Sequence, residues 1–210
     1  MEPVFLSHFI DVHTPIYGGE KGRININSVR SIDNGDSSND SIIEFPLHIG
    51  THIDFPFHFS NEGKKSNDYL ASFWIFNKIG FLSCSVDEFE IKIEELSSDI
   101  ELLIFKTGFG LYRNEDIYWS NQPVIPAKFA TILRKKFSKL RVFGFDMISL
   151  TSKLERVEGK NAHINFLLNN EILVLEDMNL LNINFTPNFV IIAPLQINKA
   201  NGVPCNVIAY

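Results

Sequence analysis

Cysteine is scarce in this sequence. The two cysteines, Cys84 and Cys205, stand far apart and lack the short spacing at which thiolates share a metal ion. Neither a disulfide framework nor a thiolate-ligated metal site is therefore indicated.

Long apolar runs and concentrated positive charge are also missing. No stretch approaches the length of a membrane span, and the N-terminal MEPVFLSHFIDVH has acids and histidines where a signal peptide would be basic and then apolar. We therefore expect a cytoplasmic protein without a membrane partner. The net charge of -6 argues against a nucleic-acid partner, because phosphate binding needs clustered Lys and Arg. The basic residues between 134 and 141 are typical of the solvated face and end of a helix.

Apolar residues are present in the ordinary amount for a globular protein. They make up 45% of the 210 residues, and charged residues make up 21%. A chain of this length can form one sizeable core, so we predict a single domain over residues 1–210, although a second domain is possible. The 19 phenylalanines predict a thick aromatic core or an aromatic pocket.

The most informative stretch is HIGTHIDFPFHF, residues 48–59. Its odd-numbered positions are mostly apolar, whereas its even-numbered positions include His48, His52, Asp54 and His58. Because side chains alternate between the two faces of an extended chain, the apolar side faces a core and the polar side faces away from it. Imidazole nitrogens and a carboxylate oxygen suit Zn, Mn, Fe or Ni better than Ca or Mg. We predict a divalent metal site, with zinc as the expected ion and manganese as the alternative; hydrogen-bonded or surface histidines are the competing interpretation.

The spacing within this stretch predicts two bends. His52 and Asp54 would lie about 6.6 Å apart along a strand, an easy reach for one ion. His48 and His52 would lie about 13 Å apart in a straight strand, near the limit for one shared ion. Gly50 is therefore the expected first bend and Pro56 the second. A helix through this segment is disfavoured by the same glycine and by the flanking prolines.

These residues resemble the HxGTHxDxPxHF signature of the metal-dependent cyclase family, which includes the bacterial kynurenine formamidases and the isatin hydrolases. Every fixed position of the signature is matched. The resemblance implies an α/β fold with a mixed, barrel-like sheet flanked by helices, a swivelling β/β/α architecture, in a protein that is usually a homodimer. The sequence's own pattern of many strands and few helices agrees with this expectation.

Downstream, the segment ILVLEDMNL at residues 172–180 is similar to a phrase of the same family, in which a Glu ends a strand that follows a helical His. The matching residues here are Glu176 and His163. The resemblance implies that one ion is held by His48, His52, Asp54 and Glu176, and a second by Asp54, His163 and Glu176.

The separation of His163 from Glu176 is one residue longer than in the family pattern. An extra residue in the turn near Asn169 or Asn170 would absorb the difference. An extra residue within the helix would instead rotate His163 by about 100° and lose the ligand. His163 then would be a capping or surface residue, so the site is expected to hold one or two ions.

The expected chemistry is hydrolysis, because a bound cation can lower the pKa of a water from 15.7 to about 7. His58 lies on the ligand face beyond Pro56, and we assign it proton transfer. The family implies cleavage of a C–N amide bond in a small aryl formamide or cyclic imide-like substrate. The alternatives are a related ring-opening or cyclising enzyme, such as an isatin hydrolase, and a metal-binding protein without activity. The aromatic residues Phe55, Phe57 and Phe59 are expected behind the site rather than against substrate.

Three further positions gain an interpretation from the family. The turn that contains Tyr17 resembles one whose aromatic residue lines the substrate pocket, although an ordinary packing tyrosine is the alternative. Asp146 follows a strand in FGFDMISL, and we expect it to cap the following turn rather than to orient metal ligands. Asn206 stands where an Arg is usual, so either anion handling or a structural ion pair is altered.

The remaining pattern is dominated by short apolar runs. They predict strands over residues 4–13, 42–45, 70–76, 80–84, 101–105, 141–147 and 171–175. Helices are predicted at 91–97 and after Pro126, where the apolar stripe of the second helix belongs to the core. Residues 31–41 contain Asn34-Gly35 and predict a hairpin loop, and residues 117–122 predict another loop.

Overall fold

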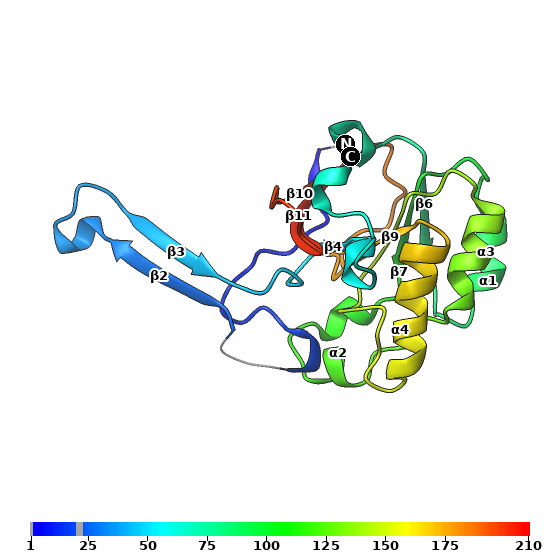
Figure 1. Ribbon diagram of the computed structural model, residues 1–210, viewed down its shortest axis with the longest axis horizontal. Coiled ribbons are helices and arrows are strands. Elements are labelled where there is room, and N and C mark those ends of the chain that lie inside the picture. Colours follow the sequence, from blue (N-terminus) through cyan, green and yellow to red (C-terminus); the bar gives the residue numbers. More distant parts are fainter. Residues whose placement is uncertain (1, 20–22) are drawn as a thin grey trace.

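A computed structural model describes residues 2–19 and 23–210 of the chain (Figure 1). The strands are β1 (Val4–Phe5), β2 (Asn25–Arg30), β3 (Asp40–Glu44), β4 (His52–Asp54), β5 (Ile75–Phe76), β6 (Ile79–Ser83), β7 (Leu102–Lys106), β8 (Val142–Phe145), β9 (Leu173–Glu176), β10 (Val190–Pro194) and β11 (Gly202–Ala209). The helices are α1 (Phe89–Lys92), α2 (Ile117–Ser120), α3 (Lys128–Lys136) and α4 (Arg156–Ile164), and a π-helix, η8 (Asn165–Asn169), continues α4. In the part of the chain described, no helix combines the length and the apolar character that a membrane span requires.

Most of the strands join in a single mixed sheet. Its order is β5-β10-β11-β4-β9-β8-β7-β6, and β1 also pairs with β11. Strands β6 to β9 run parallel, whereas β4, β10 and β11 pair antiparallel with their neighbours. The sheet curls into a nearly closed, barrel-like form, and α1, α3 and α4 lie together beside its β6–β9 part (Figure 1). The predicted mixed, barrel-like α/β fold is therefore confirmed.

The core is rich in phenylalanine, as the composition predicts. The ring of Phe143 on β8 stacks on Phe166 of the π-helix, with centroids 5.1 Å apart. Phe89 of α1 stacks on Phe129 of α3 at 4.3 Å. Burying a phenylalanine side chain contributes about 1.5–3 kcal/mol, so this aromatic layer fixes the helices against the sheet. The strand ends that carry polar residues are thereby held in place.

Strands β2 and β3 form a two-stranded arm that projects from the body of the molecule (Figure 1). Every residue of both strands is exposed. At the tip, Gly35 adopts a φ of 92°, so the predicted turn at Asn34-Gly35 is confirmed. The arm is attached through Ile24 at its base, which is buried in a small apolar cluster.

The strand predicted over residues 4–13 is wrong for most of its length. Only Val4 and Phe5 pair with β11. Beyond them, the same edge of β11 is taken by β4, which pairs with residues 202–204. The chain after Leu6 therefore has no free strand edge to join, and Phe9 is 92% exposed instead of buried.

Two other predictions are wrong in the type of element. Residues 117–122 are not a loop throughout, because Ile117–Ser120 forms the single-turn helix α2. Most of the strand predicted over 70–76 is a 3-10 turn, Ala71–Trp74, and only β5 pairs. The strands predicted near residues 80, 101, 141 and 171 are confirmed as β6, β7, β8 and β9, and the helix after Pro126 as α3. The helix expected at 91–97 begins earlier, as α1, and ends in the 3-10 turn Ile93–Glu95.

Candidate metal centre

The segment over residues 48–58 bends where the sequence predicts. Gly50 adopts a φ of 56°, and the chain becomes a strand only at His52. After Asp54, Pro56 opens a 3-10 turn that ends at His58. The first bend brings His48 Nδ1 to 2.8 Å from Asp54 Oδ1. The second brings the ring of His58 to 4.1 Å from that of His48.

Strand pairing brings in the second carboxylate. In the antiparallel pair of β4 and β9, His52 lies opposite Glu176. Glu176 ends β9, at the carboxyl end of the parallel strands, where open α/β sheets commonly bind ligands. Its Oε2 atom lies 3.4 Å from His52 Nε2.

Helix α4 carries His163 to the same place. His163 Nε2 lies 3.5 Å from Asp54 Oδ2 and 3.3 Å from Glu176 Oε1. Directly after this helix, residues 165–169 form the π-helix, in which Asn170 N donates to Asn165 O, five residues earlier. A π-turn holds one residue more than an α-turn. The additional residue that the resemblance implies between His163 and Glu176 can therefore be accommodated after the histidine, and His163 lies beside both carboxylates.

Each carboxylate lies between histidines, with a different oxygen toward each side. Asp54 turns Oδ1 toward His48 and His52 and Oδ2 toward His163. Glu176 turns Oε2 toward His52 and Oε1 toward His163. Asp54, Glu176, His52 and His163 are all buried. This is the arrangement that carboxylates bridging two cations would need.

Backbone hydrogen bonds orient the two buried histidines. His52 Nδ1 lies 2.8 Å from the carbonyl oxygen of Gly50, and His163 Nδ1 lies 2.9 Å from that of Gly159. Because a carbonyl only accepts, both Nδ1 atoms carry a proton, and both Nε2 atoms are directed at the carboxylates as the positions that a metal ion would take. Leu150 N donates to Glu176 Oε1 at 2.7 Å and fixes that side chain.

The charges of the group act strongly on one another. Burial alone would lower the pKa of His52, but its hydrogen bond to Glu176 and the nearby carboxylate charges raise that pKa to about 9. The same balance raises the pKa of His163 to about 10. Burial alone would raise the pKa of Asp54, yet hydrogen bonds with His163 and His48 hold it well below its ordinary value. The two carboxylates thus attract positive charge, and a cation must displace protons from the histidines in order to bind.

The donor set fits a divalent cation. One donor atom from each of His52, Asp54 and Glu176 lies within 4.8 Å of the others, and the same holds for His48, Asp54 and His58. His48 Nε2 is buried and, among the residues described, has no hydrogen-bond partner. Mixed imidazole and carboxylate donors are those that zinc and manganese accept. His58 is close enough to act as a donor or as a proton carrier.

These residues form one wall of a cavity of about 420 Å³. Tyr17, which the sequence analysis expects at a substrate pocket, lines it, together with Ile16 and Ile148. Phe59 also lines it and stacks on His163, with centroids 4.9 Å apart, so the expectation that Phe59 stands behind the site is wrong. The turn at Pro56 rotates this aromatic ring to the cavity side.

Two other expectations concern residues around the site. Asp146 does not cap the turn that follows it; instead it accepts hydrogen bonds from Thr107 N and Gly108 N, beyond the end of the neighbouring strand β7. Asn206 is exposed on β11, opposite Ala193.

Asp177 was missed by the sequence analysis. It is 1% exposed, lines the same cavity and follows Glu176 directly. Its partners are Arg113, 64 residues away, and Tyr118, 59 residues away. The only sequence signal is its place in the phrase EDMNL, because contacts at such separations leave no periodic pattern.

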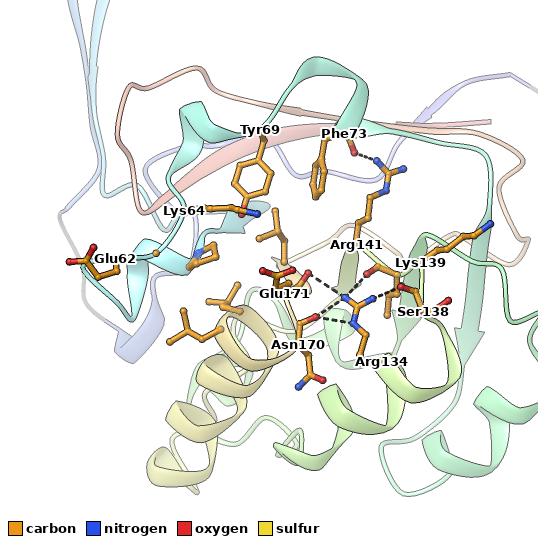
Figure 2. A pocket seen from close by; sticks show the side chains of 16 residues that line it. Glu62, Lys64, Tyr69, Phe73, Arg134, Ser138, Lys139, Arg141, Asn170 and Glu171 are labelled. Atoms are coloured by element: carbon orange, nitrogen blue, oxygen red, sulfur yellow. Dashed lines mark hydrogen bonds between the residues drawn. The ribbon is translucent and has the colours of Figure 1, made fainter.

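A larger cavity, of about 640 Å³, lies near the opposite ends of β8 and β9. Figure 2 shows Tyr69 and Phe73 on one side of it and Arg134 on the other. Arg134 donates to the backbone carbonyl of Asn170 at 2.9 Å and so braces the chain. The described residues of its lining include neither histidine nor cysteine. The cluster of histidines and carboxylates lines the cavity of about 420 Å³ instead.

Comparison with known proteins gives sequence relatives of one kind. The family model described as putative cyclase matches residues 4–151. A kynurenine formamidase of Geobacillus thermodenitrificans (strain NG80-2) is 30% identical over 156 residues, which cover 70% of this chain and 71% of that protein. A kynurenine formamidase of Bacillus thuringiensis (strain Al Hakam) is 31% identical over 169 residues, covering 77% and 75%.

Solved structures share the fold at lower identity. An isatin hydrolase bound to the product analogue thioisatinate has a TM-score of 0.80 and 18% identity, covering 99% of this chain and 91% of that one. A metal-dependent hydrolase from Bacillus stearothermophilus, described as predicted, has a TM-score of 0.75 and 19% identity, covering 99% and 97%. At this level of identity, the likeness extends to the fold.

Proposed function

Because the chain belongs to the cyclase family, we propose that it is a metal-dependent hydrolase that cleaves the C–N amide bond of a small aryl formamide or cyclic imide-like substrate. The observation that carries the proposal is the convergence of His48, His52, Asp54, His163 and Glu176 on one wall of a cavity. A cation held by these residues would lower the pKa of a water and polarise the carbonyl oxygen of the amide.

The proposed role of His58 is proton transfer. It lines the cavity beside the ligand group, and its ring lies 4.1 Å from that of His48. Burial lowers its pKa, so the imidazole is neutral at pH 7 and can accept a proton from water. The same nitrogen can then return the proton to the leaving amine, which needs it to depart.

The remaining walls suit an aryl group. Tyr17, Ile16, Ile148 and Phe59 all line the cavity and give it apolar surface. Such surfaces exclude water and hold a flat ring, whereas the few polar groups fix its orientation. We assign Tyr17 to substrate binding on this basis.

We propose a metal content of two zinc ions per chain, with manganese as the alternative metal. The support is that each carboxylate turns one oxygen toward His52 and the other toward His163. Elemental analysis of protein purified without chelators should give about two ions per chain, because three histidines and two bridging carboxylates would together hold two ions. One ion per chain would exclude a dinuclear site, and none after incubation with Zn or Mn would reject the proposed function.

The function is tested with a histidine variant and an aryl formamide. His58→Ala should lose about 10²–10⁴-fold in turnover, the usual contribution of a general acid–base, while its metal content stays unchanged. His13→Ala, which removes an exposed histidine, is the matched control. Loss of metal from His58→Ala would make His58 a ligand. If the unaltered, metal-loaded protein does not turn over the aryl formamide, the proposed activity is rejected and the protein is a metal-binding protein without it.

A homodimer is the proposed assembly. The support is the arm, where Ile26 pairs with Ile43 while 43% and 47% of their surfaces remain exposed. A two-stranded hairpin on its own is only marginally stable in water, so these side chains need a surface to cover them. A second copy of the chain supplies one by symmetry.

A further inference from the structure

Asp177 holds a backbone conformation that its residue type rarely adopts. Its φ is 51°, in the left-handed region, although it is neither glycine nor exposed. Such conformations cost roughly 1–3 kcal/mol and persist only where the surroundings fix them. They also change the direction of the chain, here directly after the proposed ligand Glu176.

The side chain of Asp177 accepts hydrogen bonds from two residues, and His8 Nε2 lies 4.0 Å from its Oδ1 atom. Arg113 Nε donates to Oδ1 at 2.9 Å, and Arg113 Nη2 donates to Oδ2 at 2.7 Å. The Tyr118 hydroxyl donates to Oδ1 at 2.6 Å. A two-point guanidinium–carboxylate pair is both strong and directional. The carboxylate is thereby neutralised beside a cavity that already contains two others.

The backbone of Asp177 joins the strands that carry the proposed ligands. Its N–H donates to Met147 O at 2.8 Å, just beyond β8. Its carbonyl accepts the hydroxyl of Thr51 at 2.5 Å. Thr51 immediately precedes His52, so a single residue links the end of β9 to the start of β4.

We propose that the ion pair of Arg113 with Asp177 positions the metal centre. The pair fixes the left-handed turn after Glu176, so that the Glu176 carboxylate points into the cavity while that of Asp177 points to Arg113. It also keeps Asp177 from competing as a ligand. Asp177 and Arg113 are positioning residues, and their role rests on the metal site of the proposed function.

Binding of Co²⁺, whose visible absorption reports its ligand geometry, tests the role. Arg113→Met should weaken Co²⁺ affinity by about 10–100-fold, as loss of a supporting partner of a metal ligand does. The cobalt absorption spectrum should also change, because the backbone turn after Glu176 is no longer fixed. Arg113→Lys keeps the positive charge but loses the two-point hydrogen bonding of the guanidinium, and it should recover part of the Co²⁺ affinity. Affinity is measured by competition with a chelator.

Asp177→Asn is the second variant, because asparagine tolerates the left-handed region and can still accept from Tyr118. It should fold and show the same weakened affinity, as the ion pair is gone. Arg134→Met is the matched control, because Arg134 is a half-buried arginine like Arg113. Arg134 donates to a backbone carbonyl at the other end of β9, away from the proposed metal centre. This variant should lower the unfolding temperature without changing the cobalt spectrum.

The outcomes separate this inference from the proposed function. Unchanged cobalt affinity and spectrum in Arg113→Met and Asp177→Asn, beside normal binding by the unaltered protein, would overturn the positioning role alone. Failure of the unaltered protein to bind cobalt would overturn the metal site and the positioning role together.

Discussion

Gly202 packs against His48 so closely that no larger residue fits. A methyl group at Gly202 would lie 2.3 Å from Cε1 of the His48 ring. Gly202 also pairs with Asp54 across β11 and β4, so the backbone cannot retreat easily. Gly202→Ala should therefore displace His48 from Asp54 and cost about 1–3 kcal/mol by overpacking.

Elemental analysis and thermal unfolding measure both effects of Gly202→Ala. We expect fewer ions per chain and a lower unfolding temperature than in the unaltered protein. Gly110→Ala is the control, because a methyl group there meets Asp146 at an ordinary 3.4 Å. Full metal content in a destabilised Gly202→Ala would argue that His48 is not a ligand.

The raised pKa values of His52 and His163 make the stability of the metal-free protein depend on pH. A histidine whose pKa is higher when folded contributes its full stability below the unfolded value of 6.5 and loses it as pH rises through the folded value. The free energy of unfolding should therefore fall from pH 6.5 to about 9 or 10. Urea unfolding of zinc-loaded protein should lack this fall, because zinc replaces the protons. The same pH dependence with and without zinc would count against the site.

Single residues were predictable where a local pattern places them. His52 and Asp54 follow from strict alternation, and the bend at Gly50 follows from the reach of one ion. Phe59 was misplaced because a 3-10 turn breaks that alternation after Pro56. Beyond its place in the phrase EDMNL, no local pattern indicates Asp177, since its left-handed backbone depends on distant partners.

At the scale of elements, the junction of α4 with the π-helix sets the position of His163. Deleting the exposed residue Asn169 should convert the π-turn to an α-turn and leave His163 beside Asp54. Inserting an alanine directly after His163 should rotate it by about 100° relative to the buried Phe166 and remove it from the site.

Metal content distinguishes the two length variants. The deletion should keep the same number of ions per chain as the unaltered protein, whereas the insertion should lose the ion that His163 helps to hold. Circular dichroism checks that both variants remain folded. Equal metal content in both folded variants would mean that His163 is not a ligand.

Strands that are buried on both faces were the most predictable elements. Strands β7 and β8 are continuous apolar runs in a parallel sheet, and sequence alone locates them within a few residues. The strand prediction is wrong after Phe5, because a strand needs an unoccupied sheet edge as well as an apolar sequence. Which edge is free depends on the whole topology.

At the scale of the whole molecule, the arm is the feature to test. Ile26→Asp adds a charge to the face shared with Ile43 and should shift a dimer toward monomer in sedimentation experiments. Asn27→Asp adds the same charge to the other face and is the control, expected to leave the mass unchanged. A monomeric unaltered protein would reject the homodimer, and an equal effect of both variants would exclude this face as the contact.

The position of β4 between β9 and β11 also sets an order of assembly during synthesis. His52 pairs with Glu176 on one side and with Pro204 on the other. These contacts span most of the chain, and pairings of such long range form slowly, because a large loop must close first. We therefore expect β4 to be seated only after β11 has been synthesised, so that the proposed metal ligands of β4 come into place late.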